Sequence, residues 1–518
     1  MDLPRSSGLL LHVTSLPSPF GIGDLGPAAY RFADVLAGAR QCVWQMLPVV
    51  PVAQSYSPYA SPSTFAGNPM LISPQRLLDA GLLHPDDLAN LPGFPDHTVD
   101  FEAVIPCKRR LLDLAFDRFE AGGATEDRVA FGQFCKNNAA WLDDYALFMA
   151  LKEAHHDASW TAWPPPLARR DADTLAHART QYARDVRRHM FWQYLFERQW
   201  AALHHYCHER GLAVLGDLPI YVAHDSSDVW ANPELFFLDD TGEPVVVAGV
   251  PPDYFSETGQ RWGNPIYRWD VMQANGFAWW TRRLQRALAL FDWIRLDHFR
   301  GFAAFWEVPA EEETAINGQW KQGPGPALFE QVEANLGRLP ILAENLGIIT
   351  DDVTALMKQF DFPGMAVLQF GFSGNADSDH LPHNYTQHLV AYTGTHDNDT
   401  LVGWWTNDEQ STLGAEAVAR ERAYALHYLN LDPHDVHDLH WRCIRAVMTS
   451  AASLVVAPVQ DVLGLGGHAR MNTPGTESGN WGWRLRPDEL DHLAGEPAAR
   501  LRALTQIYGR TEDKQPPV

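Results

Sequence analysis

The sequence predicts an α/β fold, a (β/α)8 barrel (TIM barrel) with large, mostly helical insertions between its strands. Three short apolar runs, at residues 291–296, 339–343 and 390–396, each lead into a carboxylate. Stretches with apolar residues at helical spacing separate such runs. Because a barrel carries its active site at the C-terminal ends of its strands, acids at these positions suit that fold. The length of 518 residues suits a barrel with insertions.

Composition and charge exclude several classes of protein. The balance of 46% hydrophobic and 20% charged residues is typical of a globular chain. The formal net charge of −24 argues against nucleic acid or an anionic membrane as a partner, because both require basic patches. Five scattered cysteines show neither metal-ligand spacing nor a disulfide framework. With no signal sequence and no apolar run of membrane-spanning length, we expect a cytoplasmic protein.

The stretch RLDHFRGF at residues 295–302 is the centre of the predicted site. Alternation along a strand puts Arg295 and Asp297 on the same face. A cation beside the carboxylate keeps it ionised, as a nucleophile requires. A purely structural Arg–Asp pair is the alternative. The same alternation turns His298 to the other face, so we expect no catalytic role for it.

Asp297, Glu344 and Asp397 each end one of the three apolar runs. Enzymes that cleave glycosidic bonds usually use two carboxyl groups, one on each side of the bond. The three motifs RLDHFRGF, AENLG and TGTHDND resemble the nucleophile, acid/base and third-acid segments of the α-amylase superfamily. In detail they are similar to those of the 4-α-glucanotransferases, also called amylomaltases or disproportionating enzymes, and the resemblance covers nearly the whole chain.

The resemblance implies an order of elements along the chain. Periodicity alone leaves several short runs ambiguous, and the number of eight strands follows the family pattern. A helix is expected over 24–39, and helical patterns fill 137–156 and 176–210. The expected strands are 8–13, 43–48, 212–219, 291–297, 339–344, 364–370, 390–397 and 453–458.

One catalytic unit is expected over residues 1–510. Within it, residues 70–200 form a helical insertion, and residues 218–285 form a second insertion that carries an aromatic lid. Residues 511–518 form a polar tail. Many amylases add a β-sandwich at the C-terminus, and we expect no such domain here because the chain ends soon after the eighth strand.

Further segments resemble substrate-binding parts of the family. The loop SPYASPSTFAGNP at residues 57–69 carries Tyr59, which by resemblance contacts sugar. Asp217 lies in GDLPIYV and by resemblance binds substrate, although chemistry alone also allows a helix N-cap. Asn472 lies in ARMNTPGT, a segment that the glucanotransferases carry and amylases generally do not. Substrate contacts are also expected from Arg295 and His396.

The composition of residues 249–265 predicts a loop of defined conformation, neither helix nor strand, because prolines, glycines and aromatic residues are concentrated there. The stretch resembles the lid over the acceptor side of the cleft, and Gln260 and Trp262 are its expected substrate-binding residues. Aromatic side chains on a mobile loop hold a sugar and exclude water. Without the resemblance, a surface Ω-loop is the default interpretation.

The resemblance implies retaining transfer of α-1,4-glucan segments. Asp297 is the expected nucleophile, Glu344 the acid and base, and Asp397 the group that stabilises the transition state. Glu344 requires a raised pKa, which burial and nearby acids supply. The implied partners are maltooligosaccharides and starch- or glycogen-type α-1,4-glucans, with glucose as an acceptor.

Two other functions stay open on the sequence: an α-1,4-glucan hydrolase on the same barrel, and a non-catalytic glycan-binding protein that kept the fold. The presence of all three acids counts against the non-catalytic alternative. We expect no cofactor and no metal. The adjacent histidine pairs at 155–156 and 204–205 are poor chelators, because neighbours on a helix diverge by about 100°.

Overall fold

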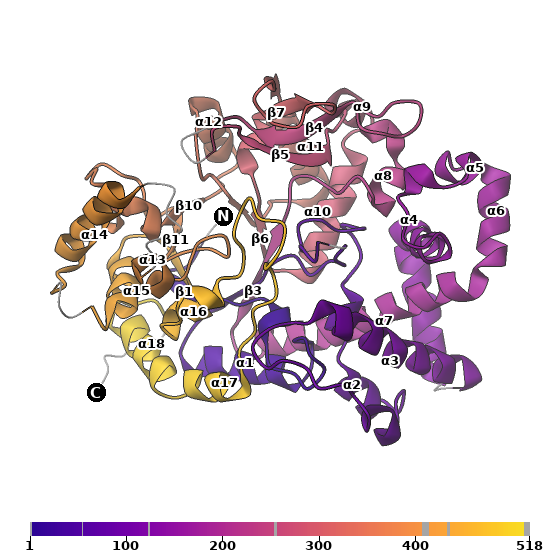
Figure 1. Cartoon of the computed structure of the whole chain (residues 1–518), viewed down its shortest axis with the longest axis horizontal. Helices are drawn as coiled ribbons and strands as arrows, with labels where there is room; N and C mark the ends of the chain where they lie inside the picture. Colours follow the sequence, from indigo (N-terminus) through magenta and orange to yellow (C-terminus); the bar gives the residue numbers. More distant parts are fainter. Residues whose placement is uncertain are drawn as a thin grey trace.

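A barrel of parallel strands forms the centre of the computed structural model (Figure 1), which describes residues 3–53, 55–122, 125–252, 256–406, 414–432 and 436–511. Its eight strands are hydrogen-bonded in the order β10-β11-β12-β1-β2-β3-β6-β9, and every pair is parallel. The (β/α)8 prediction is confirmed. The strands are β1 (Ser6–Leu10), β2 (Val43–Gln45), β3 (Ala213–Leu218), β6 (Trp293–Leu296), β9 (Ile341–Ala343), β10 (Gly364–Val367), β11 (Leu389–Tyr392) and β12 (Leu454–Pro458).

Each strand lies within or close to its predicted run, but most are shorter. The sixth was expected to reach residue 370 and ends at Val367, where the chain turns into a 3₁₀ helix over Leu368–Ser373. All positions of β1, β10 and β12 are buried. Parallel strands covered on both faces form such continuous buried runs, which explains why the apolar pattern located them.

The barrel closes between β9 and β10. The backbone N–H of Ala343 donates to the carbonyl of Pro363 at 2.9 Å. One residue beyond Glu344, the side-chain oxygen of Asn345 accepts the N–H of Met365 at 2.7 Å. The asparagine of the AENLG motif therefore helps to join β9 to β10, next to a predicted catalytic acid.

Helices cover the barrel from outside. Those that pack directly against its strands include α1 (Pro27–Gly38), α7 (Ala183–His208), α10 (Ala278–Leu290) and α15 (Leu439–Thr449). Further helices are α11 (Pro326–Leu336), α12 (Asp351–Gln359), α13 (Leu401–Thr406) and α14 (Ala415–Leu429). None of the described helices combines the length and the hydropathy that a membrane crossing requires.

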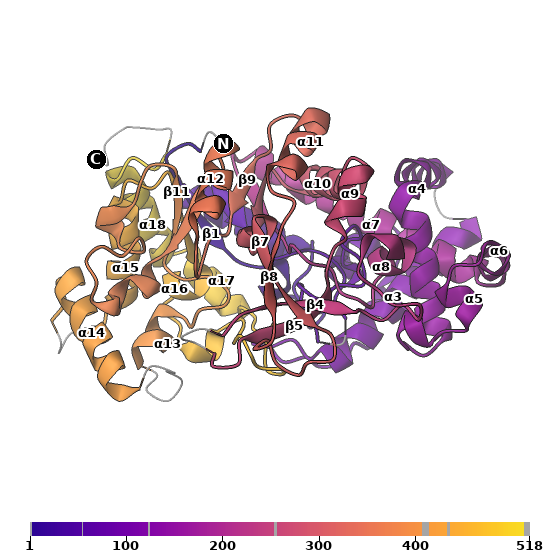
Figure 2. The same ribbon diagram turned by 90° about the horizontal axis from the view of Figure 1, so that it is seen from above.

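Between β2 and β3 the chain forms a helical region on one side of the barrel (Figures 1 and 2). The predicted pattern over 176–210 divides at Tyr182, where the backbone leaves helical geometry with φ −104° and ψ 23°. Helices α4 and α7 pack against each other in this region. Its main elements are α3 (Phe101–Gly122), α4 (Thr125–Ala154), α6 (Ala172–Gln181) and α7.

A second, antiparallel sheet lies beside the barrel at the top of Figure 1. Its order is β5-β4-β7-β8, with β4 (Val246–Val250), β5 (Gln260–Pro265), β7 (Ala304–Pro309) and β8 (Gln319–Gln322). The prediction that residues 249–265 are neither helix nor strand is therefore wrong for β5. This segment pairs with β4 despite its poor strand propensity, because the partner strand supplies the backbone bonds. Residues 253–255, which include the predicted lid residue Tyr254, lie outside the described part.

After β12 the described chain continues to residue 511 through helices and loops, including α16 (Val459–Val462), α17 (Pro487–Leu493) and α18 (Glu496–Ile507). Beyond α18, Arg510 is fully buried. Its guanidinium donates to the backbone carbonyls of Ser6, Val447, Met448, Ser450, Ala452 and Ser453. This residue ties the C-terminal part to the start of β1 and the approach to β12.

Candidate active site

Asp217, Arg295 and Asp297 lie together at the C-terminal ends of β3 and β6. The parallel register places Asp217 beside Arg295. One guanidinium nitrogen, Nη1 of Arg295, donates to both carboxylate oxygens of Asp217 at 2.8 and 2.7 Å, and it lies 2.9 Å from Oδ1 of Asp297. The backbone N–H of Asp297 donates to the Leu218 carbonyl at 3.0 Å, which extends the strand pairing to the acid itself.

Arg295 pairs with two carboxylates in different surroundings. Burial alone lowers the pKa of Arg295, but the charges of Asp217 and Asp297 raise it well above its usual value. The side chain of Asp217 is fully buried, whereas 27% of the Asp297 side chain is exposed. Asp217 therefore anchors the guanidinium, and Asp297 is the member of the pair that a substrate can reach.

Glu344 follows β9 and is held by two backbone groups. Its Oε2 accepts the N–H of His298 at 2.7 Å, and its Oε1 accepts the N–H of Leu346 at 2.7 Å. Burial raises the pKa of Glu344 to about 7; Arg295 opposes the shift, the charge of Asp297 adds to it, and the two N–H groups oppose it. Near neutral pH both protonation states are therefore populated, which suits a group that first donates and then accepts a proton.

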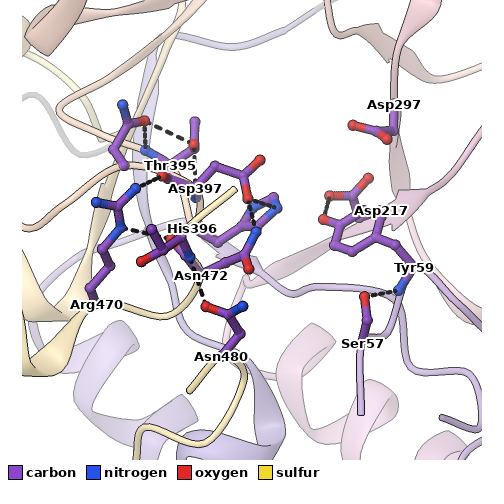
Figure 3. A network of polar contacts seen from close by, with 12 residues as sticks. Ser57, Tyr59, Asp217, Asp297, Thr395, His396, Asp397, Arg470, Asn472 and Asn480 are labelled. Atoms are coloured by element: carbon purple, nitrogen blue, oxygen red, sulfur yellow. Dashed lines mark hydrogen bonds and ion pairs between the residues drawn. The ribbon is translucent and has the colours of Figure 1, made fainter. Parts of the chain in front are cut away.

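Asp397 lies in a separate polar cluster, which Figure 3 shows across from Asp297 and Asp217. Its Oδ1 accepts from Nδ2 of Asn472 at 2.7 Å and lies 3.4 Å from Nε2 of His396. Arg470 donates to the Asp397 carbonyl at 2.7 Å, and the Asn472 N–H donates to the His396 carbonyl at 3.1 Å. The side chain of Asp397 remains 44% exposed, so it is oriented but accessible.

Tyr59 connects the two groups of acids. Its hydroxyl donates to Oδ2 of Asp217 at 2.8 Å, as Figure 3 shows. Its ring stacks on His396 with centroids 5.2 Å apart and an interplanar angle of 14°, and it also contacts Trp481 at 5.7 Å. Burial, together with the charge of Asp217, raises the pKa of Tyr59 well above its usual value, so the hydroxyl stays a donor.

Trp262 reaches the catalytic region from β5. Its indole lies edge-on to the His298 ring, with centroids 4.8 Å apart, and is 6.3 Å from the ring of Tyr221. The indole N–H donates to Oε1 of Gln260 at 3.1 Å. Trp262 is 38% exposed. The second sheet thus presents an accessible aromatic side chain beside the residue that follows Asp297.

His298 differs from the sequence expectation. Alternation would turn it away from the site, but β6 ends at Leu296 and His298 adopts a left-handed conformation with φ 48°. This turn directs its N–H to Glu344 and its ring to Trp262. Arg470 and Trp481 also lie in the site and are not among the predicted residues. Arg470 belongs to the ARMNTPGT segment, to which the resemblance draws attention. A positive φ is uncommon at a non-glycine residue, so strand alternation does not anticipate the turn at His298.

Known proteins with a similar sequence belong to one family. A family model described as 4-alpha-glucanotransferase matches residues 11–490. The 4-alpha-glucanotransferase of Thermus thermophilus is 48% identical over 515 residues, which cover 98% of this chain and all of the relative. The 4-alpha-glucanotransferase of Synechocystis is also 48% identical, with 98% of each chain covered.

Two solved structures of amylomaltases are similar to this chain. The amylomaltase from Streptococcus agalactiae in complex with acarbose superposes with a TM-score of 0.92 at 37% identity, covering 98% of this chain and all of the other. The amylomaltase from Corynebacterium glutamicum shares the fold, with a TM-score of 0.79 at 20% identity, covering 97% of this chain and 75% of the other. Family match, full-length identity and fold agree, and the chain belongs to the 4-α-glucanotransferase family.

Proposed function

We propose that this enzyme transfers α-1,4-glucan segments by a retaining double displacement in which Asp297 is the nucleophile and Glu344 the acid and base. The observation that carries the proposal is the different environment of the two carboxyls. Asp297 lies 2.9 Å from the guanidinium of Arg295, whereas burial raises the pKa of Glu344 to about 7. A buried carboxyl with a raised pKa suits the proton donor, and the exposed carboxyl beside the guanidinium suits the nucleophile.

In the first step, Asp297 attacks the anomeric carbon of the donor while the bond from that carbon to the glycosidic oxygen breaks. Glu344 gives its proton to the leaving oxygen, and a covalent glycosyl-enzyme results. In the second step, Glu344 takes the proton from the 4-hydroxyl of an acceptor. The acceptor oxygen then forms the new bond as the bond to Asp297 breaks.

Asp397, His396 and Asn472 bind hydroxyls of the sugar that reacts and stabilise its positive charge in the transition state. Their mutual contacts support this role, because a carboxylate held by an amide and an imidazole is oriented before substrate arrives. Asp217 and Tyr59 bind substrate on the adjoining side of the cleft. Arg295 positions both Asp217 and Asp297.

Transfer requires that a sugar hydroxyl, rather than water, attacks the covalent intermediate. Trp262 and Gln260 on β5 provide a lid that holds the acceptor and limits access of water. The relatives at 48% identity carry the transferase name, which favours transfer over the hydrolase and the non-catalytic alternatives. Maltooligosaccharides and starch- or glycogen-type glucans are the proposed donors, glucose is a proposed acceptor, and the cytoplasm is the proposed location.

Maltotriose tests the proposal. The purified enzyme should release glucose and build longer maltooligosaccharides, while the total number of reducing ends stays nearly constant, because each broken bond is replaced by a new one. Product sizes are followed by chromatography and reducing ends by a colorimetric assay. Reducing ends that rise in step with maltotriose loss would mean hydrolysis, and an unchanged substrate would favour a binding protein.

A further inference from the structure

Two histidines and an aspartate form a cluster at the end of the barrel opposite the catalytic acids. His204 and His208 lie in the last two turns of α7, which leads into β3. Asp292 directly precedes β6. The catalytic acids follow the C-terminal ends of the strands, so this cluster is at the N-terminal end and serves none of the steps described above.

The three side chains converge through their polar atoms. Nε2 of His204 lies 3.1 Å from Oδ2 of Asp292, and Nε2 of His208 lies 2.8 Å from Oδ1. The two imidazole rings have centroids 4.2 Å apart. The Val214 N–H donates to Oδ2 of Asp292 at 2.7 Å and fixes the carboxylate. Among the described residues, this is the one group of three potential metal ligands whose donor atoms all lie within 4.8 Å of one another.

The spacing explains the convergence. Residues four apart on a helix share one face, so His204 and His208 point the same way, whereas the adjacent pair His204 and His205 diverges. The expectation of no metal rests on the adjacent pair, whereas the histidine one turn later completes the shared face. The helix also ends at His208, where the negative end of its dipole favours a cation.

We propose that His204, His208 and Asp292 bind a divalent transition-metal ion of the zinc class. Tetrahedral zinc holds imidazole nitrogens and carboxylate oxygens at about 2.0–2.2 Å, which puts neighbouring ligand atoms roughly 3.4 Å apart. The observed separations of 3.1 and 2.8 Å need only small rotations to reach that value. Magnesium and calcium prefer shells of oxygen, so two imidazoles select against them.

The ion would have a structural role. It would join the end of α7 to the start of β6, and thus fasten the helical region to the base of the barrel. Three protein ligands leave a fourth position for water. The backbone hydrogen bond from Val214 to Asp292 orients the carboxylate before binding, as partners behind metal ligands do.

The same helix supplies a matched control. Nε2 of His205 lies 3.3 Å from Oε1 of Glu209, and both side chains are exposed. This pair contains an imidazole and a carboxylate at helical spacing but lacks the second histidine. Loss of His205 therefore reports on adventitious binding to a surface histidine, whereas loss of His208 tests the proposed site.

The test uses the untagged, chelator-treated full chain at neutral pH and titrates Zn²⁺ against a chromophoric competitor. Wild type and His205→Gln should each bind one equivalent, with no competition from Mg²⁺. His208→Gln and His204→Gln should each weaken the affinity for Zn²⁺ by ~10–100-fold or more. Co²⁺ should give the absorption of a tetrahedral site only where all three ligands remain. Saturating Zn²⁺ should raise Tm by about 2–3 °C in wild type but not in His208→Gln.

His208 is exposed, so His208→Gln is expected to fold, and its circular dichroism and transfer activity provide the check. The proposal is overturned if wild type binds no Zn²⁺, or if His208→Gln binds it as tightly as wild type. It is also overturned if His205→Gln, rather than His208→Gln, loses the ion. These outcomes are independent of the proposed catalytic roles.

Discussion

Arg295 gives two neighbouring carboxylates different roles. Both oxygens of Asp217 accept from its Nη1, and the same nitrogen lies 2.9 Å from Oδ1 of Asp297. Asp217 is buried, and Asp297 is partly exposed. At the scale of single residues, the proposed nucleophile is therefore the acid beside the guanidinium that keeps a solvent-facing surface.

Asp297→Asn should lower kcat for maltotriose disproportionation at least ~10³-fold, because the amide is nearly the same size but is not a nucleophile. Tm should change little, since Asp217 still holds Arg295. Asp270→Asn, at an aspartate that is 68% exposed, is the control and should keep full activity. Near-normal turnover in Asp297→Asn would remove the assignment.

The pKa of Glu344 predicts a pH dependence. The first step needs the protonated acid, so kcat/KM for maltotriose should fall as pH rises through about 7. With α-maltosyl fluoride as the donor, the leaving group needs no proton, and the alkaline decline should disappear. A decline at the same pH with both donors would show that another group titrates.

The sequence places the three proposed catalytic acids after apolar runs, because a buried strand leaves a visible pattern, and their roles follow from the resemblance. It did not identify the contacts that orient them. Asn472 bonds to Asp397 across 75 residues of chain, and Arg470 bonds to it across 73. No local periodicity encodes such contacts, and the resemblance alone drew attention to that segment.

At the scale of elements, β5 shows where propensity fails. The sequence of residues 260–265 contains glycine and proline, which disfavour strands. The segment is a strand because β4 pairs with it, with Gly249 opposite Arg261 and Val250 opposite Gln260. Burial on both faces left continuous apolar runs at several barrel strands, which made these visible in the sequence, whereas the number of eight strands required the family pattern.

Trp262→Ala should raise the fraction of turnovers that end in hydrolysis, because removal of the indole beside His298 opens the intermediate to water. The ratio of new reducing ends to transferred segments measures this fraction. Trp320→Ala removes an equally accessible tryptophan, 43% exposed, from β8 of the same sheet and should leave the ratio unchanged. Equal ratios in Trp262→Ala and wild type would count against a lid.

At the scale of the whole molecule, Arg510 joins the segment after α18 to the start of β1. Six carbonyls from the start of β1, the end of α15 and the approach to β12 accept from one buried guanidinium. The proposed site residues are distributed from Tyr59 to Asn472, so the geometry of the site depends on the pairing of β1 with β12. A buried guanidinium that bonds to the carbonyls at this junction stabilises it.

Arg510→Met should lower the free energy of unfolding by about 3–5 kcal/mol, because the buried carbonyls lose their donor. The expected result is a Tm lower by a few degrees at a fixed scan rate, with kcat at low temperature retained. Arg502→Met changes an exposed arginine of α18 and should leave Tm within about 1 °C. An unchanged Tm in Arg510→Met would contradict this stabilising role.

The most direct test of the account is to trap the covalent intermediate. In Glu344→Gln, α-maltosyl fluoride can still glycosylate Asp297, because fluoride leaves without a proton, whereas the second step lacks its base and is slow. Peptide mapping by mass spectrometry should find one maltosyl group on the peptide that contains Asp297. The double variant Asp297→Asn/Glu344→Gln should carry none. A maltosyl group on another carboxylate, or products of inverted configuration without any adduct, would contradict the account.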